Sequence, residues 1–248
     1  MAYIEHGLAM TGARASAART ESLVADGHKS DIESTWHAFS HSARVRTQRL
    51  DQHSVVFYEG DTANRVFEVI DGAVMLYKLL PDGRRQVVDV IGANDVFGLP
   101  RGLTHDCNAE TLTKVTLRVF DRKDTETRVE VQGHINRCLM AQVEKLHDHA
   151  VLLGRKSAFE RVASFLFRCI PDCKTDDCDG SGVHKCSSSN MITLTMTRQE
   201  IADYLGLTIE TVSRVISEFR RKGLISLEKQ DHIRINSLCG LCRMTGAH

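Results

Sequence analysis

The sequence predicts an α+β fold in which an N-terminal antiparallel β-roll, a long helix and a C-terminal winged helix-turn-helix follow one another. Short β-rich runs alternate with turn residues between Val45 and Phe120. Apolar residues then recur at helical spacing from Ile135 to Leu153. Two short helices with capping signals flank Gly206.

The composition is that of a globular protein. The chain has 248 residues, of which 42% are hydrophobic and 26% charged, enough for one to two domains of ~150 residues. The 32 basic residues balance the 32 acidic ones, which excludes a polycationic coat protein but permits a local nucleic-acid face. No apolar run approaches ~20 residues and no secretory signal is visible, so we expect a cytoplasmic protein without membrane contact, with its cysteines reduced.

Residues 1–30 are predicted to be a mobile tail and residues 31–124 the β-roll. The roll begins with a short helix over 31–39, capped by Asp31, with Trp36 and Phe39 facing inward. Turn pairs recur every 10–12 residues through the β-rich runs that follow. The Pro81-Asp82-Gly83 sequence between two apolar runs predicts a hairpin.

Residues 125–155 are predicted to form one long amphipathic helix. Its apolar stripe has a mean spacing of 3.6 residues and consists of Ile135, Leu139, Val143, Leu146, Ala150 and Leu153. Such a stripe can face the roll along part of its length and a second copy of the chain along the rest. The simpler alternative is a helix packed only on its own domain.

Residues 156–236 are predicted to be the winged helix-turn-helix domain, followed by a tail over 237–248. Ser157 with Glu160 and Thr197 with Glu200 fit capping boxes, and Thr208 caps the second helix of the motif. The polar residues 171–190 form a loop, residues 191–197 a short strand, and two further strands surround residues 229–231.

The motif leaves one set of side chains free to read bases. Its two helices pack through Ile201, Tyr204 and Leu205 on one side and Val212, Val215 and Ile216 on the other. The start of the second helix then presents Ile209, Glu210, Ser213 and Arg214 outward. Arg214 can donate two hydrogen bonds to guanine and Glu210 can accept one from cytosine. The alternative for these two residues is an ordinary surface ion pair at i, i+4.

The stretch TMTRQEIADYLGLTIETVSRVISEFRRKGLI resembles the DNA-binding segment of the CRP/FNR superfamily of transcription factors, and GLTxETxSR is most similar to its FNR and FixK branches. The runs FYEGD, VFEVIDGAVMLYKLLPDGRRQV and DVFGL resemble the cyclic-nucleotide-binding-like roll of the same superfamily. The resemblance covers residues ~31–236 in the superfamily's domain order. It implies a homodimer that binds double-stranded DNA and most often activates genes by contacting RNA polymerase.

The resemblance also implies roles for individual residues. The base-reading set would be Glu210, Ser213 and Arg214, which accompanies palindromes with TTGAT-type half-sites. Ile209 stands where some relatives carry a third base reader, and its aliphatic side chain can touch a thymine methyl group. The implied phosphate contacts are Arg198, Gln199, Thr208 and Thr211.

Two cofactors of the superfamily are not expected here. Cyclic-nucleotide members carry an acid after a Phe-Gly turn and later an Arg for the cyclic phosphate, whereas this chain has Leu99 and no Arg near Asn108. Iron–sulfur members hold the cluster with four cysteines, several of them N-terminal, and the first 106 residues here contain none. The sequence therefore predicts a FixK-like regulator without a cofactor.

The cysteine-rich loop keeps a second hypothesis open, a thiol- or metal-responsive regulator of the same fold. Cys173, Cys178 and Cys186 share the loop with His184, and Cys239 and Cys242 form a C-x-x-C. The loop spacing is irregular for zinc, so no metal site is assigned. Cys186 is the best redox candidate because Lys185 and His184 lie beside it.

An enzyme is the hypothesis from another class, and it is disfavoured. A cupin-like oxygenase needs a His-x-His and a carboxylate on the strands of the roll. His147 and His149 form a His-x-His, but on the predicted helix.

Overall fold

The computed structural model describes residues 34–40, 45–170, 191–229 and 231–246. The predicted N-terminal tail, the Asp31 cap, and the loop with Cys173, Cys178 and Cys186 lie outside these residues. Residues 34–40 are helical, as predicted for this segment. Trp36 of this helix is buried and donates a hydrogen bond from Nε1 to Oε1 of Glu68 at 2.8 Å.

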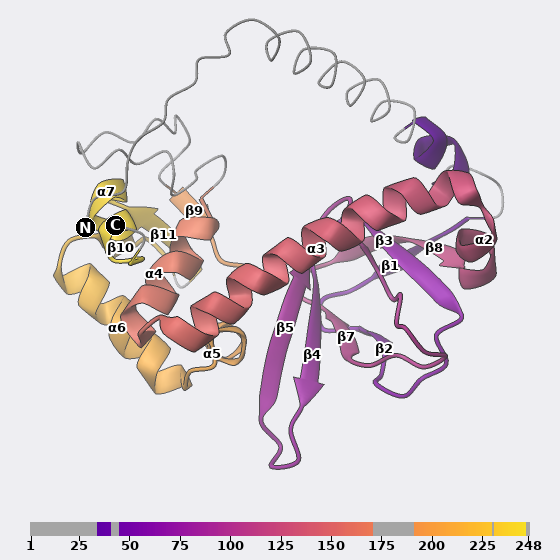
Figure 1. The fold of residues 1–248 in the computed structure, drawn as a ribbon. Helices are drawn as coiled ribbons and strands as arrows, with labels where there is room; N and C mark the ends of the chain where they lie inside the picture. Colours follow the sequence, from indigo (N-terminus) through magenta and orange to yellow (C-terminus); the bar gives the residue numbers. More distant parts are fainter. Residues whose placement is uncertain (1–33, 41–44, 171–190, 230, 247–248) are drawn as a thin grey trace, which may run out of the picture.

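Two antiparallel four-stranded sheets form the roll (Figure 1). One has the order β1 (Arg46–Leu50), β8 (Val115–Asp121), β3 (Arg65–Asp71) and β6 (Val96–Phe97). The other has the order β2 (Val55–Phe57), β7 (Asn108–Thr111), β4 (Val74–Leu79) and β5 (Arg85–Ile91). Alternating apolar residues of both sheets fill the space between them, among them Phe57, Phe67, Val74, Phe97 and Leu117.

The β4–β5 hairpin turns where the sequence predicts it. Leu79 pairs with Arg85, and the Leu80 amide donates to the Arg84 carbonyl at 2.8 Å. Gly83 adopts a φ of +84°, which an L side chain rarely tolerates. In Figure 1 the hairpin projects from the roll away from α3 (Val129–Arg155), and its strand β5 contacts α5 (Arg198–Leu205) of the C-terminal half.

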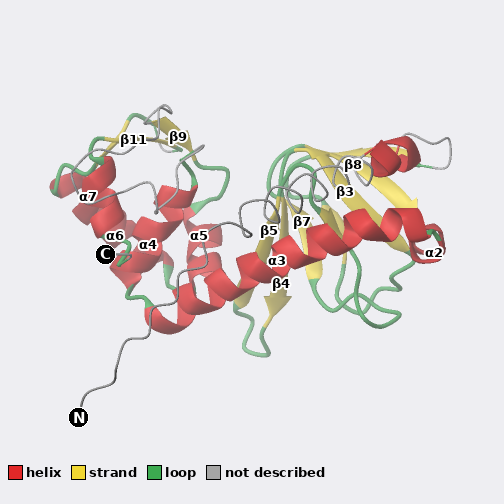
Figure 2. Ribbon diagram, turned by 45° about the horizontal axis from the view of Figure 1, so that its top comes forward, coloured by secondary structure: helices red, strands yellow, loops and turns green. Residues whose placement is uncertain are grey.

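The long helix α3 (Val129–Arg155) follows the short α2 (Arg122–Thr127) and runs from the roll to the C-terminal domain (Figure 2). Its N-terminal half packs on the roll, where Val131 and Ile135 share a core with Trp36, Val66, Val96 and Phe120. Polar contacts continue this packing, since Gln142 donates from Nε2 to the Val96 carbonyl and Lys145 pairs with Asp95 at 2.9 Å.

The C-terminal domain is a helix-turn-helix with a wing. It contains α4 (Ala158–Arg168), β9 (Met191–Thr193), α5 (Arg198–Leu205), α6 (Ile209–Arg221), β10 (Ile225–Leu227) and β11 (His232–Ile235). The wing sheet has the antiparallel order β10-β11-β9. Both predicted capping boxes are formed, by Ser157 with Glu160 and by Thr197 with Glu200.

The prediction of a tail from residue 237 onward is wrong for the described residues. Ser237 caps a further helix, α7 (Leu238–Arg243), by accepting a hydrogen bond from the Gly240 amide at 3.1 Å. Leu241 and Cys242 are buried, and α7 packs on α4. Six residues are too few for a helical period to show in the sequence, and burial against α4 stabilises the helix instead.

The roll and the C-terminal domain share one hydrophobic core. Met75, Tyr77, Val87 and Leu112 from the roll belong to the same buried cluster as the helix-turn-helix residues. Among the described residues, no helix is both long and apolar enough to cross a membrane.

Candidate nucleic-acid interface

Two helix caps and a shared apolar core join α5 and α6, the two helices of the helix-turn-helix. Gly206 ends α5 in the left-handed conformation, with φ +60°, and its amide bonds to the Ala202 carbonyl. Thr208 begins α6, because its hydroxyl accepts a hydrogen bond from the Thr211 amide at 3.3 Å. The six apolar residues predicted to join the helices, Ile201, Tyr204, Leu205, Val212, Val215 and Ile216, are all buried in one core.

The structure places the four predicted base readers together on the opposite, solvent-facing side of α6. Ile209, Glu210, Ser213 and Arg214 are all exposed. Glu210 and Arg214 form no ion pair with each other in the described part of the chain, and both side chains are exposed. The backbone N–H of Glu210, and after it the Thr208 hydroxyl, donate hydrogen bonds to the Glu210 carboxylate and lower its pKa. This carboxylate therefore stays an acceptor at neutral pH.

Three of the four predicted phosphate contacts lie next to this surface. Gln199 and Thr208 are exposed, Thr211 is half-buried, and Gln199 donates from Nε2 to Oδ1 of Asp203 at 2.7 Å. A cleft of about 790 Å³ runs beside them and is bounded on its other side by Leu80 and Gly83–Gln86 of the β4–β5 hairpin.

Arg198 differs from the other three. Its side chain is half-buried, and its Nη1 atom is buried without a hydrogen-bond partner among the described residues. Burial also lowers the pKa of this guanidinium, because a low-dielectric surrounding disfavours its charge. To contact a phosphate, Arg198 would have to change its conformation.

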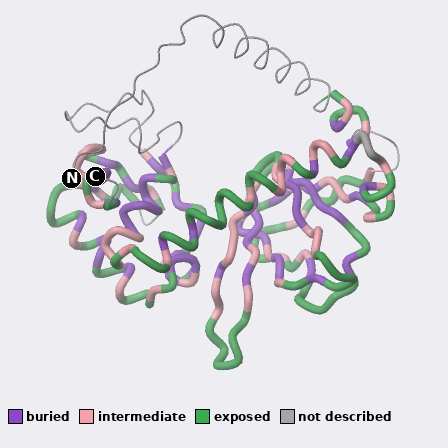
Figure 3. Tube along the Cα trace, in the orientation of Figure 1, coloured by how far each residue is buried: buried purple, intermediate pink, exposed green. Residues whose placement is uncertain are grey.

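The predicted stripe on α3 passes through three environments. Ile135 is buried and Leu139 half-buried against the roll, whereas Leu153 packs on the core of the C-terminal domain. Between these ends, Val143, Leu146 and Ala150 are exposed, and Figure 3 shows an exposed stretch along the middle of the long helix. The exposed fractions of Val143 and Leu146 are 43% and 44%.

Two further apolar residues of α3 were missed by the sequence analysis. Met140 is 67% exposed and Val151 is 56% exposed. At 3.6 residues per turn, Met140 lies about 60° around the helix from Val143, and Val151 lies about 100° around from Ala150 in the same direction, so both flank one edge of the exposed strip. A stripe drawn as a single line at 3.6-residue spacing omits its flanks, and a two-dimensional helical projection would have included them.

The interior of the roll is filled by its own side chains. The rings of Phe57, Phe67 and Phe97 are in mutual contact, and His105 stacks on Phe57 with 3.6 Å between ring centroids. Arg101 is exposed. Asn108 is buried, with its side chain accepting from the Glu59 amide at 3.1 Å and donating to the Tyr77 carbonyl at 3.4 Å.

Five cysteines lie among the described residues. Burial raises the pKa of Cys107 to about 12 and that of Cys169 to about 11, so neither is a ready thiolate. Cys239 is half-buried and Cys242 is buried in the core beside α4. Within the part of the chain that the structure describes, no three His, Cys, Asp or Glu side chains group to hold a metal ion. The redox role of Cys186 stays a prediction from the sequence.

Known proteins share both halves of this architecture. The family of Crp-like helix-turn-helix domains matches residues 160–244, and the family of cyclic nucleotide-binding domains matches residues 47–130. The nitrogen fixation regulation protein FixK of Rhizobium meliloti is 35% identical over 190 residues, which cover 75% of this chain and 82% of FixK. The transcriptional activatory protein AadR of Rhodopseudomonas palustris is 36% identical over 188 residues, covering 72% and 75% of the two chains.

A solved structure extends the similarity to three dimensions. FixK2 from Bradyrhizobium japonicum superposes with a TM-score of 0.70 at 32% sequence identity. The match covers 82% of this chain and 98% of the FixK2 chain.

Proposed function

Since this chain is a DNA-binding transcription activator of the CRP/FNR family, in its FixK-like branch, we propose that it binds a palindrome with TTGAT-type half-sites as a homodimer. It does so without cyclic nucleotide or an iron–sulfur cluster. It acts in the cytoplasm and recruits RNA polymerase, as the family resemblance implies, and it has no enzymatic activity. Its curated relatives are transcription regulators, which supports the last point.

The observation that carries the proposal is the exposed face of α6. A helix whose buried side is held by α5 and whose outward side presents Glu210, Ser213 and Arg214 has the arrangement of a recognition helix in the major groove. In this proposal Arg214 reads guanine and Glu210 reads cytosine, while the aliphatic side chain of Ile209 touches a thymine methyl. Gln199, Thr208 and Thr211 contact the flanking phosphates, and Arg198 joins them if its side chain leaves its half-buried position.

The proposed dimer forms along α3. Exposed apolar side chains in the middle of a 27-residue helix favour burial against a second copy, because the same strip is available on each chain. The interface would comprise Val143, Leu146 and Ala150 with Met140 and Val151 at its edges, and Leu139 and Leu153 at its ends. Ile135 faces the roll and contributes by anchoring the helix.

Binding without a cofactor is supported by the roll itself. The ring contacts of Phe57, Phe67, Phe97 and His105 occupy its interior, and the Asn108 side chain is engaged in bonds within the roll. The half-buried position of Cys107 and its raised pKa make it a poor cluster ligand.

The test is a fluorescence-anisotropy titration of chelator-treated, reduced protein against a palindrome with two TTGAT half-sites and against a scrambled duplex. We expect at least a thousandfold preference for the palindrome, as for other specific binders. Adding cyclic AMP should leave the affinity unchanged. Specific binding that occurs only with cyclic AMP, or only with a reconstituted cluster, would contradict the cofactor-free part. Equal affinity for both duplexes would contradict the proposal that α6 recognises the base sequence of the palindrome.

A further inference from the structure

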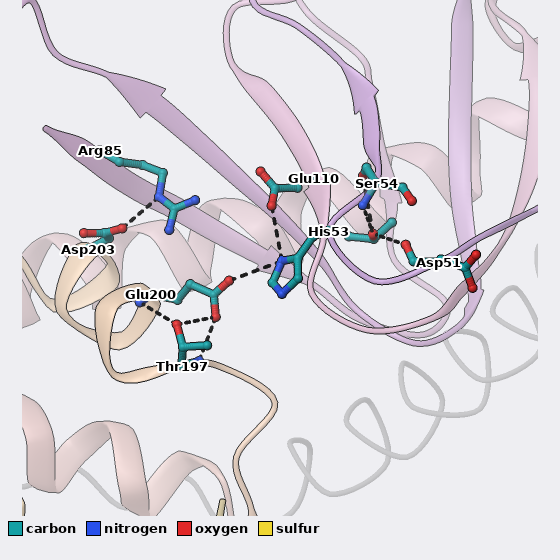
Figure 4. Close-up of polar contacts among 9 residues, drawn as sticks. Asp51, His53, Ser54, Arg85, Glu110, Thr197, Glu200 and Asp203 are labelled. Atoms are coloured by element: carbon teal, nitrogen blue, oxygen red, sulfur yellow. Dashed lines mark hydrogen bonds and ion pairs between the residues drawn. The ribbon is translucent and has the colours of Figure 1, made fainter. Parts of the chain in front are cut away.

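The helix-turn-helix is docked on the roll by polar contacts as well as by the shared core. In Figure 4, Arg85 of β5 points toward Asp203 of α5, and His53 lies between Glu110 of the roll and Glu200 of α5. Arg85 Nε donates to Asp203 Oδ2 at 2.7 Å, and His53 Nδ1 lies 3.3 Å from Glu110 and 3.7 Å from Glu200. Gln86 adds a hydrogen bond from Nε2 to the Tyr204 carbonyl at 3.4 Å.

The Arg85–Asp203 pair is the most shielded of these contacts. Its side chains are 24% and 10% exposed, whereas the His53 side chain is 48% exposed. The guanidinium of Arg85 also lies 5.3 Å from the centre of the Tyr77 ring, which gives it a second partner in the roll. A partly buried, hydrogen-bonded ion pair has a defined geometry, unlike a surface pair that solvent and salt screen.

Asp203 extends this contact to the DNA-facing surface. Its Oδ1 atom accepts the hydrogen bond from Gln199, while Oδ2 accepts from Arg85. One carboxylate thus joins a strand of the roll to a side chain that the proposed function assigns to a phosphate. Both Asp203 and Arg85 border the cleft beside the start of α6.

We propose that Arg85 and Asp203 are a positioning pair that sets the orientation of the recognition helix relative to the roll, and thereby the half-site spacing that the dimer accepts. The inference rests on the proposed function, because spacing has meaning only for two linked half-sites. Two recognition helices must enter the major groove about one helical turn, ~34 Å, apart. A DNA-binding domain that the roll holds at one angle meets that requirement without losing conformational entropy on binding. A loosely held domain loses entropy when it binds, and it can adapt to several half-site spacings.

The experiment compares variants of the full-length chain on four duplexes. These are the palindrome, the palindrome shortened or lengthened by two base pairs at its centre, and a single half-site. Arg85→Gln and Asp203→Asn each remove the ion pair and leave an acceptor for Gln199. We expect each to lose about tenfold in affinity for the natural spacing, within the usual range of coupling between sites, and to discriminate less between spacings. Half-site affinity should stay within about twofold, because α6 itself is unchanged.

The matched control is Arg84→Gln. Arg84 precedes Arg85, is exposed, and pairs only with Asp82 among the described residues, at the hairpin turn. This variant removes the same charge and should keep both the affinity and the spacing preference of the parent. The charge-reversed double variant Arg85→Asp/Asp203→Arg should recover part of the spacing preference that either single variant loses.

The outcomes distinguish a failure of the proposed function from a failure of the positioning role. If the parent protein does not prefer the palindrome over scrambled DNA, the proposed function fails. If the parent prefers it but Arg85→Gln and Asp203→Asn keep its spacing preference, the positioning role is wrong. It is also wrong if the single half-site loses as much affinity as the palindrome, or if Arg84→Gln has the same effect as Arg85→Gln. Thermal unfolding of each variant shows whether a loss of DNA affinity arises because the variant is unfolded. If one of the two single variants is unfolded, the other one tests the positioning role.

Discussion

Arg161 of α4 donates a hydrogen bond from Nη1 to the backbone carbonyl of Leu205, the last residue of α5, at 2.9 Å. The same guanidinium donates to the Leu153 carbonyl at 2.6 Å, and its Nε atom donates to the Lys156 carbonyl at 2.8 Å. Carbonyls at the C-terminal ends of helices lack partners within the helix and carry partial negative charge. One cation therefore joins the end of α3, the start of α4 and the turn of the helix-turn-helix.

Replacing Arg161 by Met should lower the free energy of unfolding by about 1.5–3 kcal/mol, the range for losing hydrogen bonds to a charged group. Met keeps the apolar stem and removes all three donors. Urea unfolding at neutral pH measures the effect. Arg155→Met, at an exposed position near the end of α3, is the control and should change stability by less than about 0.5 kcal/mol. Equal effects of the two variants would mean that the three bonds add no stability.

Replacing Leu146 by Glu should convert the proposed dimer into monomers, because it buries a charge on each side of the interface at α3. The monomers should bind the palindrome poorly, since the second half-site contact is no longer linked to the first. Analytical ultracentrifugation at micromolar concentration measures the association state. Ala141→Glu introduces the same group at an exposed position five residues earlier, about 140° around the helix, and should stay dimeric. A dimeric Leu146→Glu protein would place the interface elsewhere.

Replacing Arg214 by Ala should cost about 1–3 kcal/mol at the guanine of each half-site and relax discrimination at that base pair. The readout is a set of duplexes with each base substituted in turn. Arg220→Ala removes an exposed charge from the far end of the same helix and should weaken specific and random DNA alike. If Arg214→Ala shows that same uniform loss, Arg214 contacts the backbone and does not read a base.

We expect the stability of the protein to depend on pH because of His149 of α3. Burial, reinforced by the nearby Arg168, lowers its pKa from 6.5 to about 4, and its ring packs 4.3 Å from that of Tyr204. The folded state thus holds the neutral imidazole, and the unfolded state binds a proton more readily. The contribution of the neutral His149 ring to the free energy of unfolding is complete above pH 6.5 and is lost as the pH falls toward 4. Between pH 7.5 and 4.5 this loss amounts to about 2–3 kcal/mol.

The measurement is urea unfolding of the parent and of His149→Phe at these two pH values. Phe keeps the ring against Tyr204 and cannot be protonated, so the variant should lose less stability on acidification. The same exchange at the exposed His37 controls for removing a histidine as such. An unchanged pH dependence in His149→Phe would show that this residue does not cause the acid sensitivity.

Much of the candidate site could be predicted from the sequence because its determinants are local. The Thr197–Glu200 capping box, the left-handed Gly206 and the Thr208 cap each involve residues within four positions of one another. The outward placement of Glu210 and Arg214 follows from the apolar period of the same helix. The position of Arg198 did not follow, because burial of a side chain at a helix start depends on what packs against it from elsewhere.

By itself, the sequence determined the order of the elements, the hairpin turn at Gly83 and the exposed face of α6, because hydrogen bonds and periodicity over a few residues specify each of them. The tertiary structure alone decided which part of the α3 stripe meets the roll, that residues 238–243 form a buried helix, and that Arg85 meets Asp203 across 118 positions of sequence. Contacts of that range arise only when two separately folded surfaces pack together. Their pairing depends on the shape and charge of both surfaces, which no local pattern encodes.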